Sequence, residues 1–265
     1  MSMWSRHHAW TQVLPPSRPT PQELTRVRDV ISTFRNPRVA VMGSTPEFRT
    51  ICGQMLVTGV VTIDNSLEFH ESVDPLVTTR PTSERFVHTS WQRFFLETDD
   101  LFDLILSDLT LGNIPYEERP QLFRDIHRTL KRGGYFIDKV LTNEGRPWDA
   151  EDIGRKYAAL PLNLETVNAF NCEAIFCGTH SVNGVLNAAH AYDNLEQQLG
   201  HCDHLASLIR ECEVITPRHM LWYYGLPWSD VDKYYAHGLS RVARFSQEAQ
   251  SPYLHHAYQF FNHKL

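Results

Sequence analysis

The chain has 265 residues, with 25 basic and 31 acidic side chains that give a formal net charge of −6. With 42% hydrophobic and 21% charged residues, the composition is typical of a globular protein and disfavours a disordered or nucleic-acid-binding chain. No run approaches the ~20 apolar residues of a membrane helix, and the N-terminus lacks the apolar segment of a secretory signal. The cysteines form no CxxC pair and the histidines no HExxH motif, so we expect a cytoplasmic protein without disulfides or a bound metal.

Residues 1–36 are rich in aromatic side chains and in proline. Four prolines between positions 15 and 21 exclude a regular helix or a central strand there. Thr20, with Pro21 at the next position and Glu23 three positions on, has the spacing of a helix-capping box. We therefore expect a helix after Thr20, and we interpret 1–36 as a cap that is either a lid over a site or a packing strap.

From residue 38 the pattern changes to short apolar runs separated by helical segments. Strands are expected at 39–42, 60–63, 85–88, 102–107 and 135–137, and helices at 47–55 and 120–131. This alternation is typical of a parallel sheet with crossover helices. The sequence therefore predicts a doubly wound α/β core over 37–145, with helices on both faces of the sheet.

Beyond residue 145 the pattern is looser. We expect helices at 148–160, 192–210 and 230–245, a polar, turn-rich segment at 161–190, and a late strand within 214–228. We assign 146–265 to a helical and loop insertion on the substrate side, followed by the C-terminal completion of the core.

In an open α/β sheet, ligands bind beyond the carboxyl ends of the strands, so the residues there are the candidate site. They are Gly43, Ser44, Thr45, Glu47, Asp64, Asn65, Ser90, Trp91, Asp108 and Leu109. For a nucleoside ligand, Gly43 would allow close approach of the backbone and Asp64 could accept both ribose hydroxyls. Ser90 and Trp91 could contact an adenine, and Asp108 could pair with an ammonium group. A nicotinamide dinucleotide is disfavoured because the first turn lacks GxGxxG.

Three segments together resemble the class I, Rossmann-like S-adenosylmethionine (SAM)-dependent methyltransferases. They are VAVMGSTPEFR at 39–49, VTIDNS at 61–66 and FDLILSDL at 102–109; the later LKRGGYFI at 130–137 resembles that superfamily's LKPGG segment, with Arg132 in place of proline. The resemblance covers about 36–141 and implies a mostly parallel, seven-stranded sheet. It also implies that Gly43, Ser44, Thr45 and Glu47 line the methionine moiety, with Asn65 and Leu109 adjoining the cofactor. Asp64 would bind the ribose, Ser90 and Trp91 the adenine, and Asp108 would face the sulfonium.

The resemblance implies a biosynthetic SAM-dependent methyltransferase. Its acceptor would be a small molecule of natural-product or secondary metabolism, methylated on an O, N or C atom. No catalytic residue can be assigned from the sequence. Candidate acceptor-site residues are aromatic or polar side chains outside the core: Trp10, Arg18, Asn143, Tyr157, Asn171, His180, Trp222 and Tyr223. They indicate a small, partly aromatic acceptor in an enclosed pocket. We expect no nucleic-acid or membrane partner, and a homodimer is left open.

The sequence leaves two alternative functions open. One is a SAM-consuming cyclase or lyase that releases methylthioadenosine, the chemistry that makes azetidine-2-carboxylate. The other is a non-catalytic SAM-binding scaffold. The first motif departs from the usual acidic, GxGxG form, and Ser90 replaces the adenine-side acid. An altered first motif under an aromatic cover is compatible with a pocket that holds SAM alone, so product formation must separate the three hypotheses.

Overall fold

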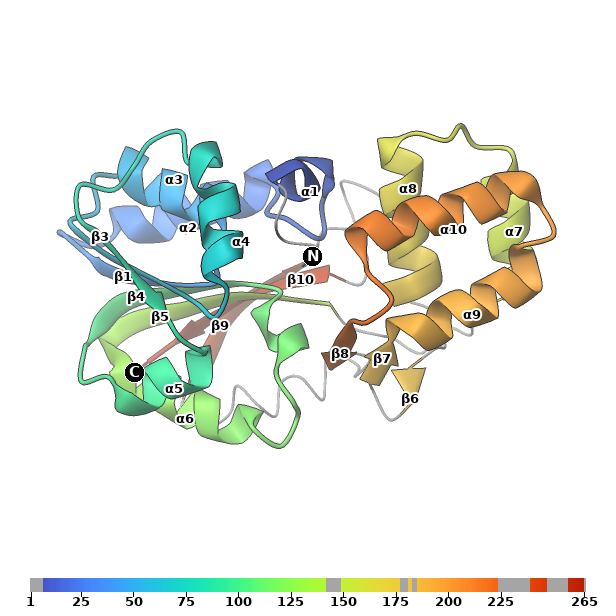
Figure 1. The fold of residues 1–265 in the computed structure, drawn as a ribbon. Coiled ribbons are helices and arrows are strands. Elements are labelled where there is room, and N and C mark those ends of the chain that lie inside the picture. Colours follow the sequence, from blue (N-terminus) through green and yellow to red (C-terminus); the bar gives the residue numbers. More distant parts are fainter. Residues whose placement is uncertain are drawn as a thin grey trace.

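The centre of the structure, a computed structural model, is a seven-stranded sheet in the order β3-β2-β1-β4-β5-β10-β9 (Figure 1). The structure describes residues 7–141, 149–176, 181–182, 185–223, 239–246 and 257–264. The strands are β1 (Arg38–Met42), β2 (Gly59–Asp64), β3 (Glu84–His88), β4 (Phe102–Asp108), β5 (Leu130–Leu141), β9 (Ser240–Ser246) and β10 (Ala257–His263). The first five are parallel, and β10 is antiparallel to both β5 and β9. The predicted doubly wound α/β class is confirmed.

Helices cover both faces of this sheet (Figure 1). On one face lie α2 (Pro21–Ser32) and α3 (Pro46–Gln54), and on the other lie α5 (Trp91–Glu97) and α6 (Arg119–Thr129). Side chains along β4 alternate between the two layers, so Leu104 and Leu106 pack under α2 and α3 whereas Ile105 packs against α5 and α6. The order of strands reverses between β1 and β4, which places the ligand crevice of such a sheet at their carboxyl ends.

The start of α2 forms as the sequence predicts. The N–H of Glu23 donates to Thr20 Oγ1 at 3.1 Å, and the N–H of Thr20 donates to Glu23 Oε2 at 2.7 Å. This reciprocal capping box fixes a buried glutamate in the first turn of the helix. Glu23, Val27 and Ile31 then form the buried row of α2 over the sheet.

A helical unit is inserted between β5 and β9. It contains α7 (Ala150–Ala158), α8 (Leu164–Phe170), a π-helix (Asn171–Phe176), α9 (Ala188–Leu199) and α10 (Asp203–Ile215), with a small sheet of β6 (Ser181–Val182), β7 (Val185–Asn187) and β8 (Leu221–Tyr223). Tyr157, Phe170 and Tyr192 are buried in its own apolar core. Figure 1 shows this unit beyond the carboxyl ends of the parallel strands, with α1 (His7–Gln12) between it and α4 (Leu67–Val73).

Three expectations about the C-terminal half are wrong. The segment 161–190 is not turn-rich, because it contains α8, the π-helix and β7. The expected helix at 192–210 is two helices, which break around Gly200. The expected helix at 230–245 falls partly outside the described residues, and its remainder is β9, where pairing with β10 overrides the local helical pattern. Within the part of the chain that the structure describes, no helix is both long and apolar enough to cross a bilayer.

Candidate functional site

A cavity of about 390 Å³ lies at the carboxyl ends of the parallel strands, between the sheet and the helical unit. Nine of the ten residues predicted from the strand ends line it: Gly43, Ser44, Thr45, Asp64, Asn65, Ser90, Trp91, Asp108 and Leu109. They come from four turns far apart in the sequence. The turns meet because parallel strands all end at one edge of the sheet.

The turn after β1 exposes backbone to this cavity. Gly43 has a φ of +86°, a conformation that favours glycine, and its N–H donates to the carbonyl of Ile63 at 2.8 Å. A Cβ built on Gly43 would lie 4.0 Å from Cζ2 of Trp91. The Trp91 indole is fixed in turn, because its Nε1–H donates to the same carbonyl of Ile63 at 2.8 Å. Gly43 and Trp91 therefore form one rigid part of the wall.

Asp64 joins the turns that follow β1 and β2. Its Oδ2 accepts the N–H of Ser44 at 3.0 Å, and its Oδ1 accepts the N–H of Ser66 at 2.9 Å. Burial raises the pKa of Asp64, and the hydrogen bonds from Ser66 and Ser44 oppose that rise. Asp64 also lines the cavity, where its carboxylate can accept hydrogen bonds from ligand hydroxyls.

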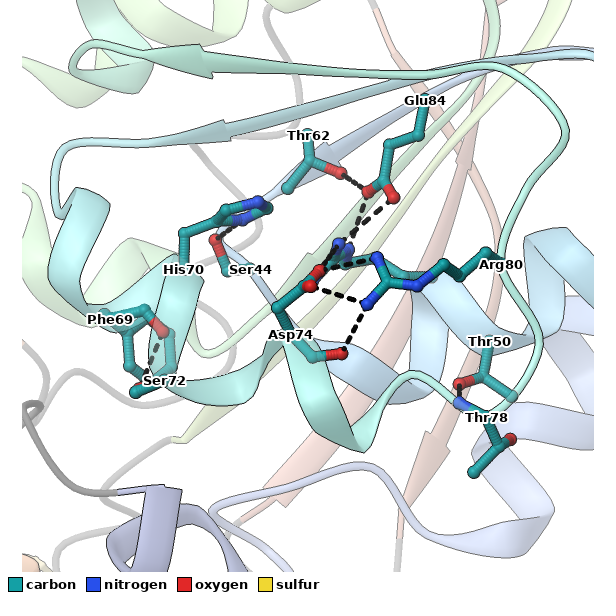
Figure 2. Close-up of polar contacts among 11 residues, drawn as sticks. Ser44, Thr50, Thr62, Phe69, His70, Ser72, Asp74, Thr78, Arg80 and Glu84 are labelled. Atoms are coloured by element: carbon teal, nitrogen blue, oxygen red, sulfur yellow. Dashed lines mark hydrogen bonds and ion pairs between the residues drawn. The ribbon is translucent and has the colours of Figure 1, made fainter.

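The wall near Ser44 is supported by a polar network between α3, α4 and β3 (Figure 2). Ser44 Oγ lies 3.0 Å from Nδ1 of His70, whose ring stacks on Phe86. Behind them the buried Arg49 binds Glu84 at 2.6 Å and Asp74 at 2.6 Å. This network fixes α4 relative to α3, and with it the cavity residues at the start of α4.

The same network lowers the pKa values of its two carboxyl groups. Burial opposes ionisation of Glu84, yet hydrogen bonds from Arg49 and Thr62 outweigh it and lower the pKa. Arg80, and after it Arg49, holds the pKa of Asp74 well below its usual range. Both carboxyl groups therefore stabilise the fold in their ionised form.

Asp108, at the end of β4, already has an ammonium partner. Its Oδ1 lies 2.6 Å from Nζ of Lys139 on β5, and Oε2 of Glu23 lies 3.6 Å from the same Nζ. Burial raises the pKa of Asp108 to about 7, an effect that Lys139 partly offsets. Burial disfavours the charge of Lys139, but Asp108 and Glu23 more than compensate and raise its pKa. The ammonium expected from a ligand is thus supplied by the protein.

Glu47 does not line the cavity, contrary to the sequence prediction, because the N-terminal segment covers it. Its Oε1 accepts the indole N–H of Trp10 at 3.1 Å and also binds Arg18. Trp10 lines the cavity as predicted, but Arg18 does not. The segment is tied to the helical unit as well, since Asn168 accepts the N–H of Leu14 at 2.9 Å and donates to the carbonyl of residue 12 at 3.0 Å.

On the acceptor side, Trp222 and Tyr223 line the cavity as predicted, whereas Tyr157 and Asn171 do not. Tyr157 is buried inside the helical unit, where its hydroxyl donates to Glu173 at 3.1 Å, and Asn171 is buried in the π-helix. Asn143 and His180 lie outside the described residues. No group of three metal-ligating side chains occurs among the residues that the structure describes.

Most of the apolar residues that line the cavity, and one cationic residue, were not predicted from the sequence. The apolar residues are Val13, Met42, Phe69, Leu111, Val140, Leu141, Phe176, Ile215 and Met220. Their side chains resemble ordinary core residues, so only the packing of the helical unit reveals them. The cation is Arg119, at the start of α6, whose guanidinium binds the carbonyls of Leu111 and Ile114 at 2.8 and 3.0 Å.

Comparison with known proteins defines the class of this fold and site. Residues 45–138 match the family model described as a methyltransferase domain. The CcbJ methyltransferase from Streptomyces caelestis is 11% identical, with a TM-score of 0.55 over 100% of this chain and 98% of that one. The N-methyltransferase NodS from Bradyrhizobium japonicum WM9, solved with S-adenosyl-L-homocysteine, is 10% identical, with a TM-score of 0.52 over 98% of both chains.

A third structure carries a different description. It is a Rhodobacter sphaeroides protein described as a Zn-dependent alcohol dehydrogenase, 14% identical over 100% of both chains, with a TM-score of 0.57. No curated protein matches the sequence. At these identities the likeness shows the fold alone, so the domain match decides the class.

Residues 45–138 therefore match a methyltransferase domain, and the chain has the class I, Rossmann-like fold. The resemblance to SAM-dependent methyltransferases found in the sequence is confirmed, and with it SAM as the cofactor of this class.

Proposed function

We propose that this protein transfers the methyl group of SAM to a small acceptor bound in the same cavity. The observation that carries the proposal is the change of character along the cavity wall. At one end the wall consists of the polar turns after β1 and β2, and at the other it is apolar and comes from β5, the π-helix and β8. A cofactor and an acceptor of different chemistry can therefore lie next to each other.

The polar end fits SAM, which supplies a methyl group on a positively charged sulfur. Asp64 lines this end of the cavity, and its carboxylate can accept hydrogen bonds from the ribose hydroxyls. The fixed indole of Trp91 offers an apolar surface to the adenine, and Ser90 adds a hydroxyl that also caps α5. The exposed backbone at Gly43 allows the methionine moiety to approach the turn after β1.

The apolar end favours an acceptor with a flat, apolar body. The rings of Phe176 and Trp222 lie 4.6 Å apart at 35° to each other, and Leu141 and Met220 contribute to the same wall. Trp10 and Val13 of the N-terminal segment cover the cavity and are nearly fully buried. An enclosed site of this kind excludes water from the methyl transfer and suits a small molecule better than a protein or a nucleic acid.

The test starts with the purified protein and SAM alone, with nucleoside products followed by mass spectrometry. We expect SAM to bind and to stay intact until a panel of small phenols, amines and aliphatic analogues is added. Release of S-adenosylhomocysteine with a methylated acceptor supports the proposal. Methylthioadenosine formed without an acceptor would establish the cyclase or lyase, which neither the domain match nor the fold favours. SAM that stays unchanged with every acceptor would favour the scaffold.

A further inference from the structure

Asp108 lies where the ligand crevice of the sheet meets a cluster of buried charged side chains. It is the last residue of β4, at the point where the strand order reverses. Leu109, directly after it, has a φ of +57°, a strained conformation for leucine, and its N–H donates to the carbonyl of Lys139 at 3.0 Å. Strained backbone of this kind is concentrated at functional sites.

The register of the sheet fixes the partner of Asp108. Asp108 and Lys139 are paired residues of the parallel strands β4 and β5, so their side chains leave the same face side by side. Leu104, Leu106 and Asp108 form one row on that face, and Ile137 and Lys139 form the next. The charged pair therefore closes an apolar layer at the carboxyl ends of β4 and β5, where Asp108 lines the cavity and Lys139 lies behind it.

Two further contacts hold this pair in place. Lys139 Nζ lies between Oδ1 of Asp108 and Oε2 of Glu23, and all three side chains are only 2% exposed. Glu23 is itself fixed by the capping box of α2. When all three groups are ionised, one positive charge stands against two negative charges, so the cluster carries an excess negative charge in a buried position.

The other carboxylate of the cavity wall is poorly placed to accept a proton from the acceptor. Among the described residues that line the cavity, the carboxylates are Asp64 and Asp108, and no histidine, cysteine or lysine is present. Asp64 accepts two backbone N–H groups and stands at the end of β2, beside Asn65 and Ser66, where the ribose is expected. Asp108, at the end of β4, stands two strands nearer to β5, whose residues Val140 and Leu141 begin the apolar end.

We propose that Asp108 is the proton acceptor of the reaction, with Lys139 and Glu23 as its positioning residues; this rests on the function proposed above. As the acceptor's O or N atom forms a bond to the methyl carbon, the carbon–sulfur bond breaks and its electron pair stays on sulfur. The proton that the nucleophile loses moves to the carboxylate of Asp108. The positive charge of the sulfonium and the negative charge of Asp108 disappear in the same reaction.

The electrostatics favour this direction of proton movement. Asp108 is faced by Lys139 from β5, by Glu23 from α2 and by Glu47 from α3, and Arg119 lines the same cavity. The positive charge of a sulfonium in the cavity favours the ionised form of Asp108, whereas a neutral thioether has no such effect. Because burial already places the pKa of Asp108 near 7, the loss of that one charge favours proton uptake at neutral pH.

The test measures this proton without any need to know the acceptor. Calorimetric titrations of the wild-type protein with SAM and with S-adenosylhomocysteine, in buffers of different ionisation enthalpy, give the protons taken up on binding. We expect more uptake with S-adenosylhomocysteine than with SAM near pH 7. Asp108→Asn should abolish the difference while both ligands still bind, and the exposed Asp99→Asn should preserve it. The double variant D108N/K139M, which removes both charges, replaces D108N if the single variant does not fold.

The outcomes separate the two proposals. Failure of the wild-type protein to bind either nucleoside would refute the proposed function itself. Binding of both, with equal proton uptake or with a difference that survives in the Asp108 variants, would refute the role of Asp108 alone. With an acceptor from the screen, kcat of D108N should fall about 100-fold or more, with KM for SAM unchanged and the pH dependence near 7 lost.

Discussion

Replacement of Asp64 by alanine tests the cofactor end of the cavity most directly. The carboxylate is expected to bind the ribose through charge-assisted hydrogen bonds, so its loss should weaken SAM binding by roughly 1.5–3 kcal/mol. That corresponds to an increase of about 10- to 150-fold in Kd. S-Adenosylhomocysteine carries the same ribose and should lose the same factor, which separates a ribose contact from an effect on the sulfonium.

The variant also loses two bonds inside the protein. The N–H groups of Ser44 and Ser66, at 3.0 and 2.9 Å from the carboxylate, would turn to water in the cavity. We therefore expect a moderate fall in the free energy of unfolding, about 1–3 kcal/mol, and a folded protein at 25 °C. Calorimetry at this temperature, with circular dichroism as the folding check and Asp99→Ala as the control, measures both effects. A folded D64A protein that binds SAM as tightly as the wild type would refute the ribose assignment.

Three further predictions concern the cover, the acceptor end and the supporting network. Deletion of residues 1–19 should preserve the sheet, as judged by circular dichroism, but lower SAM affinity and turnover; loss of folding would instead show a packing strap. Trp222→Ala should raise KM for the acceptor by about 10- to 100-fold through lost apolar contact, and an equal change in the Kd of SAM would count against its position. Arg49→Ala should lower the free energy of unfolding at pH 7 by about 2–4 kcal/mol, a range that allows for partial exposure of Asp74. Because folding lowers the pKa values of Glu84 and Asp74, their stabilisation is present above about pH 5 and is lost as the pH falls below 4. Urea unfolding at pH 7 and pH 3 should show a smaller difference in the variant, and an undiminished difference would contradict this account.

The sequence determined the features that depend on local pattern. Apolar runs of four to six residues between helical segments are sufficient to predict parallel strands, and the carboxyl ends of such strands converge on one edge. For that reason nine of ten residues chosen from strand ends line one cavity. The capping box at Thr20 and Glu23 was predictable as well, because both of its hydrogen bonds lie within a single helical turn.

Other features depend on contacts between distant segments, and only the tertiary structure decided them. Its residue type alone favoured Tyr157 for the acceptor site, but the packing of the helical unit buries Tyr157 in the core of that unit. Glu47 lies on the predicted turn, yet Trp10 and Arg18 from the N-terminal segment bind it. The edge strand β9 and its neighbour β10 form because β10 pairs with both β9 and β5, and these are contacts between segments far apart in the sequence.

The charged cluster at Asp108 is the clearest case of this difference. The sequence pattern predicted Asp108 at a strand end but not its partners. These are Lys139 on the neighbouring strand β5 and Glu23 on α2, near the N-terminus. The register of β4 and β5 decides that Asp108 and Lys139 lie side by side. The packing of α2 on the sheet decides that Glu23 lies beside them. Burial then changes the charge of the group, and burial is a property of the folded chain alone.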